Sequence, residues 1–171
     1  MVTGGRTTQP IGHYEFCQRY HRECTQRTAA TAPVELTRQL WSELITVNNR
    51  VNQRVEPRTD MEMWGRQEVW SYPDAVGDCE DYVIEKRREL MAAGLPAGSL
   101  LITVVRQPNG DGHAVLTVRT SAGDYILDNL EGRVLAWQDT EYTYLKRQSD
   151  NNSGSWVSIN DGRAVAVGSV K

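Results

Sequence analysis

The sequence predicts an α+β protein, in which helices come first and an antiparallel sheet follows. Two observations support this fold class. Over residues 34–55 and again over 78–93, apolar residues follow a helical spacing, which is typical of amphipathic helices. After Pro96 they alternate with polar residues and are often β-branched, which is typical of strands. We therefore expect N-terminal helices that pack on a C-terminal sheet.

Length and composition indicate a single domain over residues 1–171. Of these residues 39% are hydrophobic and 24% are charged, and the chain contains no internal repeat or Pro/Gly-rich linker. The polar residues 1–12 are expected to be flexible. A net charge of −3 gives no positive field for binding nucleic acid. No stretch approaches the roughly 20 apolar residues that span a bilayer, so we expect no membrane span.

The first long helix is expected over residues 34–55. Pro33 suits its first turn and Pro57 stops it. The apolar residues that trace one face of this helix are Leu36, Leu40, Leu44, Val47, Val51 and Val55. The next segment, residues 57–77, contains two tryptophans and no clear period. We expect it to be an ordered loop that packs its aromatic side chains against the core.

A second helix is expected over residues 78–93, with Asp78 as its N-cap and Gly94 as its stop. This start places Cys79 in the first turn of the helix. The residues expected on or near its apolar face are Tyr82, Val83, Leu90 and Met91.

Several strands are expected in the second half of the chain, and "TSAGD" is a hairpin signal between two of them. The "QPNGDG" segment before His113 is typical of a turn. The expected strands are residues 99–106, 113–120 and 124–130, with further candidates at 142–149, 155–159 and 163–167.

Cys79 is the first candidate for chemistry. A helix N-terminus carries partial positive charge and unpaired N–H groups, which stabilise a thiolate. The carboxylates of Asp78, Glu80 and Asp81 oppose this effect by repelling the thiolate, unless a cation or hydrogen bonds hold them. A cysteine at a helix start is more often a small buried residue than a nucleophile, so Cys79 by itself leaves both roles open.

A nucleophilic cysteine needs a base, and the base needs an orienting partner. His113 opens the second predicted strand and Asp128 lies near the end of the third. With a two-residue hairpin loop at Ser121 and Ala122, His113 is one diagonal step from Asp128 on the same face. A three-residue loop sends Asp128 to the opposite face. The spacing therefore permits a triad of Cys79, His113 and Asp128 without requiring it.

Two further cysteines, Cys17 and Cys24, stand seven residues apart. In an exported protein a bridge between them leaves Cys79 as an odd free thiol, whereas in a cytosolic protein all three thiols are reduced. The first ten residues lack the apolar core of a signal peptide, so the chain is either cytoplasmic or the mature part of an exported protein. His13 and His21 lie near these cysteines, but the spacing fits no usual zinc pattern.

Three motifs occur in order at suitable distances: "GDCEDY" at residues 77–82, "GHAVL" at 112–116 and "LDNL" at 127–130. Together they resemble the bacterial transglutaminase-like cysteine proteinases, a family that includes the LapG-type periplasmic proteases of surface adhesins. The resemblance covers residues 47–130. It implies a papain-like or transglutaminase-like cysteine peptidase fold.

Position by position, Cys79 matches the family's nucleophile, His113 its general base and Asp128 the acid that orients the histidine. The reaction implied is acyl transfer through a thioester on Cys79, which water resolves. The N–H of Cys79 is a candidate donor to the oxyanion. Trp64 and Gln67 lie upstream, and no role in the reaction is assigned to them. Two alternatives stay open: transglutaminase or amidase chemistry, which shares the acyl-enzyme, and a peptide-binding module with an idle triad.

The resemblance also implies a cofactor, a location and partners. LapG-type members depend on calcium through acidic residues beside the nucleophile, and Asp78 and Glu80 match those positions. The alternative is that Asp78 caps the helix and Glu80 complements its dipole. A periplasmic or secreted location follows from the family, and it favours a disulfide between Cys17 and Cys24. The expected partners are a protein or peptide substrate, such as a surface adhesin, and a membrane-tethered regulator.

Overall fold

The computed structural model describes residues 1–28 and 32–162, and its largest element is an antiparallel sheet. The strand order is β1-β9-β8-β4-β5-β6-β7. The strands are β1 (Thr3–Thr7), β4 (Leu100–Arg106), β5 (Gly112–Thr120), β6 (Gly123–Leu127), β7 (Leu135–Ala136), β8 (Thr143–Ser149) and β9 (Asn152–Ile159). The predicted strands at residues 99–106, 113–120, 124–130, 142–149 and 155–159 correspond to β4, β5, β6, β8 and β9.

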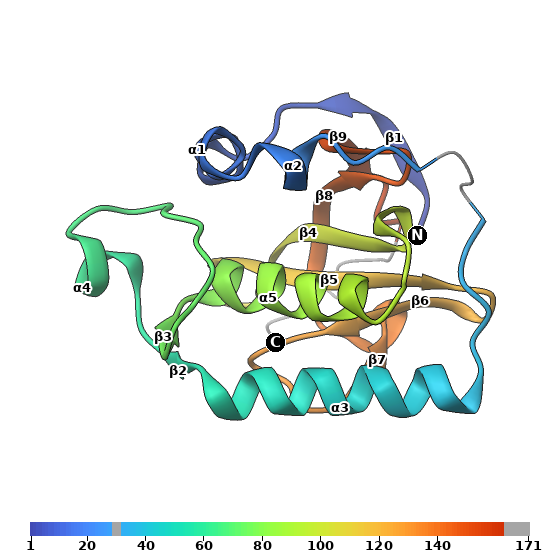
Figure 1. The fold of residues 1–171 in the computed structure, drawn as a ribbon. Coiled ribbons are helices and arrows are strands. Elements are labelled where there is room, and N and C mark those ends of the chain that lie inside the picture. Colours follow the sequence, from blue (N-terminus) through green and yellow to red (C-terminus); the bar gives the residue numbers. More distant parts are fainter. Residues whose placement is uncertain (29–31, 163–171) are drawn as a thin grey trace, which may run out of the picture.

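Helices from the first half of the chain pack against this sheet, so the predicted α+β class is confirmed. Figure 1 shows α5 lying across the sheet beside β5, with α3 running alongside β6 and β7 and with α1 and α2 near β9. The helices are α1 (Ile11–Arg19), α2 (His21–Cys24), α3 (Arg38–Arg54), α4 (Asp60–Trp64) and α5 (Cys79–Ala92), with short 3₁₀ turns η1 (Ala97–Ser99) and η2 (Trp137–Asp139). A small parallel pair, β2 (Glu56–Pro57) and β3 (Val76–Gly77), precedes α5. In the part of the chain that the structure describes, no helix is long and apolar enough to cross a membrane.

The main hydrophobic core lies between α3, α5 and the sheet. Leu44 and Val51 of α3, Leu90 of α5, and Leu116 and Leu127 of the sheet are fully buried within it. Each such side chain contributes about 1.5–3 kcal/mol by leaving water. Because strand residues alternate between faces, the neighbouring positions form a second, smaller cluster on the other side of the sheet. Its buried members are Val105, Val115, Ile126, Tyr144 and Ile159.

The start of α3 differs from the prediction. The helix begins at Arg38, after an N-cap at Thr37 whose side chain accepts a hydrogen bond from the N–H of Leu40 at 3.0 Å. Val34, predicted to be helical, instead pairs with the end of β5: its N–H donates to the carbonyl of Arg119 at 3.1 Å. The sheet edge satisfies the backbone of this β-branched residue, so the segment stays extended until the threonine cap.

The segment over residues 57–77 is ordered, as expected, but it is not only a loop. It contains α4, and β3 closes it by pairing with β2. Trp70 is buried in the main core, as predicted. Trp64 is 57% exposed, so the prediction that the aromatic side chains of this segment pack against the core is wrong for this residue. Trp64 ends α4, and Gly65 then turns the chain in the left-handed conformation with φ 67°.

The N-terminal residues also differ from the expectation. Residues 3–7 were expected to be flexible, but they form the edge strand β1 against β9. A Cβ at Gly4 would lie 2.4 Å from the hydroxyl of Ser158, so glycine permits this close pairing. Most side chains of β1 are exposed, which explains why the sequence shows no hydrophobic alternation there. The predicted strand at residues 163–167 lies outside the described residues.

Candidate active site

Cys79 is the first residue of α5, as the sequence predicted. Its thiol donates a hydrogen bond to Oε2 of Glu80 at 2.9 Å. Burial raises the pKa of the thiol well above its ordinary value, and the carboxylates of Glu80 and Asp78 raise it further. The N–H of Ala114 on β5 acts in the opposite direction. Burial first, and the carboxylates second, thus outweigh any stabilisation of the thiolate by the helix N-terminus, and the thiol is protonated with these neighbours alone.

The hairpin between β5 and β6 has the two-residue loop on which the sequence argument depended. Thr120 pairs with Gly123, which leaves Ser121 and Ala122 as the loop. Gly123 has φ 119°, a conformation that favours glycine. With this register, the predicted diagonal neighbours meet.

His113 and Asp128 form a buried hydrogen-bonded pair. Nε2 of His113 lies 2.8 Å from Oδ1 of Asp128, and the two residues are 5% and 2% exposed. This contact leaves Nδ1 as the ring nitrogen that can face a reactant. Cys79 approaches the same strand, because its thiol interacts with the N–H of Ala114, the residue after His113. The structure thus brings the three predicted residues to one end of β5, with the thiol bonded to Glu80.

The carboxylate of Asp128 is held by several donors. Oδ1 accepts from His113 and from the N–H of Leu130 at 3.0 Å, and Oδ2 accepts from the hydroxyl of Tyr142 at 2.5 Å. Burial alone would raise the pKa of Asp128, but these hydrogen bonds and the charge of His113 hold it below its ordinary value. Asn52 of α3 also donates to the backbone carbonyl of Asp128 at 2.8 Å. The carboxylate is therefore stabilised in its charged form.

A cluster of aspartates lies beside Cys79. Carboxylate oxygens of Asp60, Asp78 and Asp81 lie within 4.8 Å of one another. Asp60 and Asp81 are held by the N–H groups of Val69 at 2.5 Å and Ser71 at 2.7 Å. Yet each of the three aspartates keeps one buried oxygen without a hydrogen-bond donor: Oδ1 of Asp60, Oδ1 of Asp78 and Oδ2 of Asp81. Unpartnered, hard carboxylate oxygens that converge are the donor set that calcium prefers.

Electrostatic repulsion within this cluster is strong. Burial and the charges of Glu80, Asp81 and Asp60 raise the pKa of Asp78 to about 9. Burial raises the pKa of Asp81 to about 7, with the charges of Asp60 and Glu80 adding to the effect. Burial also raises the pKa of Asp60. A bound cation would reverse these shifts, because it favours the charged form of every carboxylate around it.

Of the two predicted calcium residues, Asp78 belongs to this cluster. Glu80 lies close enough to Asp78 to raise the pKa of Asp78. Asp78 occupies the N-cap position of α5, but its side chain makes no capping hydrogen bond. The alternative role as a helix cap therefore lacks the contact that defines it. Sequence reasoning missed Asp60 and named Asp81 only for its charge. The available signal was the "T-x-x-E" box at Thr59, which starts α4 at Asp60.

Two local features bring this cluster together. The side chain of Thr59 accepts from the N–H of Glu62, and the carboxylate of Glu62 accepts from the N–H of Thr59 at 3.0 Å. This capping box sets the first turn of α4 and hence the position of Asp60. Gly77 lies directly against Asp81, where an added Cβ would be 2.8 Å from the Asp81 Cβ. Trp64 and Gln67 are exposed and make no part of this cluster.

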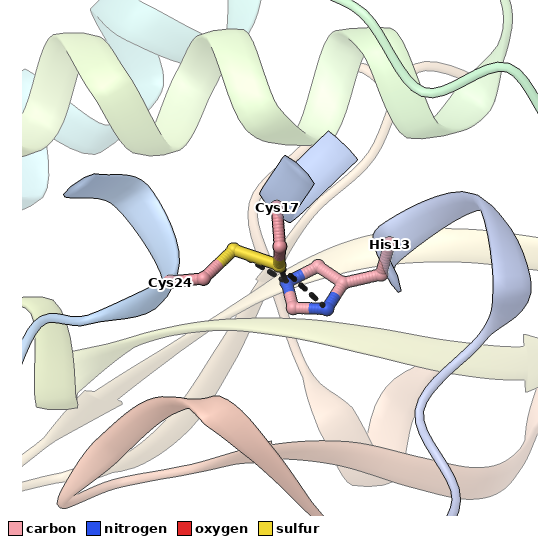
Figure 2. Close-up of side chains that lie close together, drawn as sticks. All are labelled: His13, Cys17 and Cys24. Carbon is pink, nitrogen blue, oxygen red and sulfur yellow. Dashed lines mark hydrogen bonds between the residues drawn. A yellow bond between two sulfur atoms is a disulfide. The ribbon is translucent and has the colours of Figure 1, made fainter. Parts of the chain in front are cut away.

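Cys17 and Cys24 form a disulfide that joins α1 to α2, and Cys79 is a free thiol. Figure 2 shows the buried ring of His13 beside the two sulfurs, with Nε2 3.8 Å from each. Nδ1 of His13 accepts from the indole N–H of Trp156 at 3.2 Å. Burial lowers the pKa of His13 to about 3, and the charge of Arg87 adds to the effect. His13 is thus a neutral core residue, whereas His21, the other histidine near these cysteines, is exposed.

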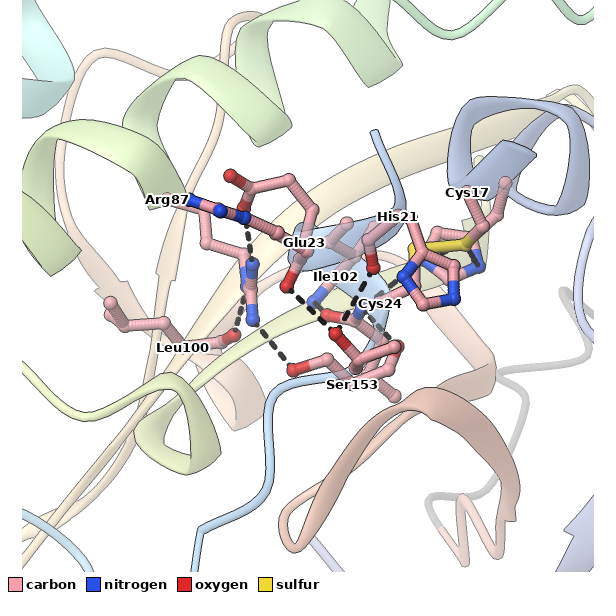
Figure 3. Close-up of polar contacts among 12 residues, drawn as sticks. Cys17, His21, Glu23, Cys24, Arg87, Leu100, Ile102 and Ser153 are labelled. Atoms are coloured by element: carbon pink, nitrogen blue, oxygen red, sulfur yellow. Dashed lines mark hydrogen bonds and ion pairs between the residues drawn. A yellow bond between two sulfur atoms is a disulfide. The ribbon is translucent and has the colours of Figure 1, made fainter. Parts of the chain in front are cut away.

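Arg87 anchors the far part of α5. Figure 3 shows its guanidinium donating to the carbonyl of Leu100 and to the hydroxyl of Ser153, both at 2.9 Å. It also lies 3.6 Å from the carboxylate of Glu23 in α2. A buried guanidinium with these partners is satisfied, and it ties α5 to β4, β9 and α2. This connection holds the helix that carries Cys79 against the sheet that carries His113.

Comparison with known proteins decides the family. The family model of the bacterial transglutaminase-like cysteine proteinases (BTLCP) matches residues 3–164. The chain belongs to this family. It is therefore a transglutaminase-like cysteine peptidase, as the motifs around Cys79, His113 and Asp128 predicted.

Solved structures support the same family. The chain is similar to calcium-bound LapG of Legionella pneumophila, with a TM-score of 0.61 and 27% sequence identity over 74% of each chain. It has the fold of EGTA-treated LapG of the same organism, with a TM-score of 0.59 and 23% identity, covering 89% of this chain and 80% of that one. A comparison with curated proteins found no match.

Proposed function

We propose that this peptidase cleaves a protein substrate with Cys79 as nucleophile, His113 as general base and Asp128 as the acid that orients His113. The observation that carries the proposal is the buried hydrogen bond of 2.8 Å between His113 and Asp128, at the strand that approaches the thiol. A histidine held by a carboxylate on one nitrogen presents the other nitrogen in a fixed direction and tautomer. This is the arrangement that activation of a cysteine requires.

The reaction proceeds in two balanced steps. Nδ1 of His113 takes the thiol proton, and Sγ of Cys79 attacks the carbonyl carbon of the scissile amide. The C–N bond breaks, the leaving amine takes the proton from His113, and a thioester remains on Cys79. Water then attacks the thioester and gives a proton to His113, and the departing sulfur recovers that proton while the carboxylic acid leaves. Backbone N–H groups at the start of α5, including that of Cys79, are the proposed donors to the oxyanion.

We infer that Asp60, Asp78, Asp81 and Glu80 hold a calcium ion. The inference is supported by the three unpartnered buried oxygens and by the similarity to LapG, which has been solved bound to calcium. Bound calcium supplies positive charge beside the nucleophile. In that field, Glu80 and Asp78 no longer raise the pKa of the Cys79 thiol as strongly, so His113 can take its proton.

A cell-surface protein, such as an adhesin, is the proposed substrate, and the proposed location is the periplasm or the outside of the cell. The family resemblance supports this, and a bonded Cys17 and Cys24 is compatible with an oxidising compartment. A membrane-tethered regulator of the enzyme is proposed on the same family basis.

A second candidate is a peptide-binding module with an idle triad. The hydrogen bond from Cys79 to Glu80 favours it, because a thiol with a raised pKa is a poor nucleophile. The two candidates differ in what calcium does to the thiol. The peptidase proposal requires that calcium activates it, whereas a binding module keeps an inert thiol in either condition.

The test is the rate of Cys79 alkylation by iodoacetamide against pH, with calcium and with EGTA, followed by intact mass. Peptidase activity predicts rapid labelling below the ordinary thiol pKa with calcium, and slow labelling with EGTA. His113→Ala should abolish the rapid labelling, and the exposed His21→Ala should retain it. Slow labelling with an ordinary or raised pKa in every condition would support the idle module instead.

A further inference from the structure

Tyr142 contacts the His113 and Asp128 pair from a part of the chain that the family motifs do not include. It lies just before β8, whereas His113 opens β5 and Asp128 follows β6. In the sheet, β4 and β5 separate β8 from β6. Tyr142 nevertheless reaches Asp128, and its ring packs against the smaller core cluster defined above. A residue next to a strand that does not neighbour β6 therefore contacts the His113–Asp128 pair.

The hydroxyl of Tyr142 holds the carboxylate oxygen that His113 does not use. Oδ1 of Asp128 receives the His113 ring and the N–H of Leu130, and the Tyr142 hydroxyl donates to Oδ2 at 2.5 Å. A carboxylate bonded at both oxygens cannot turn about its own axis without breaking one of these bonds. Hydrogen bonds to a charged acceptor are also the stronger ones. The plane of the Asp128 carboxylate is thus set from both sides.

The ring of Tyr142 also contacts the histidine. The two ring centroids lie 5.4 Å apart with an interplanar angle of 57°. One side chain thus touches both members of the pair, through its hydroxyl and through its ring. Beside them lies an open cavity of about 460 Å³ that is lined by Asp128, Leu130 and Tyr142, among others. Without the Tyr142 hydroxyl, water from this cavity would reach Oδ2.

We propose that Tyr142 is a positioning residue for the triad. It keeps Oδ1 of Asp128 on Nε2 of His113, so that Nδ1 stays directed at the thiol and the imidazolium stays paired with a charged carboxylate. The proposal rests on the proposed function of Cys79, His113 and Asp128. It adds a fourth side chain that touches none of the reacting atoms and acts through Asp128.

Loss of the Tyr142 hydroxyl should change the pH dependence of Cys79 alkylation. If the Tyr142 hydroxyl is removed, the Asp128 carboxylate stabilises imidazolium less, so the thiolate–imidazolium pair forms at higher pH. The acid limb of the Cys79 alkylation profile should then move upward. Other groups that interact electrostatically with this site remain in place in Tyr142→Phe, namely Lys86 of α5 toward Asp128, and Tyr144 and Glu131 toward Tyr142.

The experiment compares Tyr142→Phe with Tyr144→Phe, in calcium, by the same alkylation profile and by thermal unfolding. Tyr144 is the matched control, because its hydroxyl lies 2.9 Å from that of Thr140, whereas the hydroxyl that donates to Oδ2 of Asp128 is that of Tyr142. We expect Tyr142→Phe to slow alkylation at pH 7 by about tenfold and to raise the midpoint of the acid limb by about one pH unit. Tyr144→Phe should stay within about twofold of wild type, since surrounding packing is kept.

A second pair of variants separates positioning from a change in stability. In an Asp128→Asn background the Tyr142 hydroxyl has no charged oxygen to hold, so adding Tyr142→Phe should slow alkylation no further. Equal profiles for wild type and Tyr142→Phe, with a wild-type thiol that is activated, would overturn the role of Tyr142 alone. A wild-type thiol that is never activated would overturn the proposed function and this role with it. Additive losses in the double variant would also contradict the positioning role.

Discussion

Two buried aspartates in the same site, Asp128 and Asp81, differ in the direction of their pKa shifts. Asp128 and Asp81 are almost equally buried, at 2% and 1% exposed. The pKa of Asp128 is lowered, whereas burial raises that of Asp81 to about 7. The difference lies in the neighbours: Asp128 has donors at both oxygens, and Asp81 has one oxygen without a donor and other carboxylates nearby. Burial alone does not decide the charge of a carboxylate; the groups that face it do.

This contrast separates two ways to keep a carboxylate charged. Asp128 is stabilised by His113, Tyr142 and a backbone N–H, all supplied by the chain itself. Asp60, Asp78 and Asp81 each keep one buried oxygen without a donor, and the proposed calcium ion would bind at these oxygens. Under the proposed function, Asp128 needs no added ion to stay charged, whereas the acidic cluster would make the site responsive to calcium. Five predictions test this distinction.

The largest effect is expected for Asp128→Asn, which keeps the shape of the side chain and removes its charge. The asparagine cannot stabilise imidazolium. The rate of Cys79 alkylation and the rate of peptide cleavage should therefore both fall by a factor on the order of 10³. The measurement is cleavage of a peptide library, with kcat and KM determined separately. A loss of less than about tenfold would mean that Asp128 does not orient His113. Asp139→Asn, on a neighbouring turn, serves as the control.

Calcium should stabilise the protein through the acidic cluster. At a concentration 100 times the Kd, binding raises the free energy of unfolding by about 2.7 kcal/mol, because calcium binds the folded chain alone. The measurement is the Tm in calcium and in EGTA, with magnesium at equal concentration as the control for charge screening. Magnesium demands a tighter octahedral site and should give the smaller shift. Equal Tm values in calcium and EGTA would remove the calcium proposal.

Without calcium, the acidic cluster should make stability fall as pH rises. The folded-state pKa values of Asp78 and Asp81, about 9 and about 7, lie above the ordinary value of 3.8. The folded state therefore binds protons more tightly, and the stability that this contributes is fully present below about pH 4 and is lost progressively as pH rises to the folded pKa values, about 7 for Asp81 and about 9 for Asp78. Asp128 behaves oppositely, because its lowered pKa gives stability that is lost on acidification.

A substitution follows from the same reasoning. In EGTA at pH 8, Asp78→Asn should raise the free energy of unfolding by about 1–2 kcal/mol, because folding then no longer requires Asp78 to bind a proton that the unfolded chain has released. In calcium it should lower stability relative to wild type, because a ligand is lost. The exposed Asp74→Asn is the control and should change neither value by more than about 0.5 kcal/mol. A loss of stability in both conditions would show that repulsion does not dominate the cluster.

The smallest effect is expected at the capping box that places Asp60. Thr59→Ala removes the cap of α4 and should cost about 1 kcal/mol of stability, with a weaker affinity for calcium. Thr37→Ala removes the cap of α3 at a similar cost in stability, far along the chain from the acidic cluster. Isothermal titration should therefore find a changed calcium Kd for the first variant only. The same Kd in both would mean that the α4 turn does not position Asp60.

Much of this site could be predicted from local sequence signals. The helical period of residues 78–93, with Asp78 as the expected N-cap, placed Cys79 in the first turn of α5. The "TSAGD" segment predicted a hairpin, and a two-residue loop in that hairpin gives the strand register that places His113 near Asp128. Such signals are reliable because caps, periods and turns depend on neighbours within a few residues. The first turn of α3 was predicted wrongly because it depends on a contact that is distant in sequence: Val34 pairs with β5.

The sequence by itself therefore determined the order of helices and strands, the position of Cys79 and the candidate pair of His113 and Asp128. Only the tertiary structure decided that Asp60 joins Asp78 and Asp81, and that Tyr142 holds Asp128. These contacts join residues from separate elements, and no local period or turn encodes their distance. They depend on how α4, α5 and the segment before β8 are placed in the whole fold, and packing sums many weak contacts across that fold.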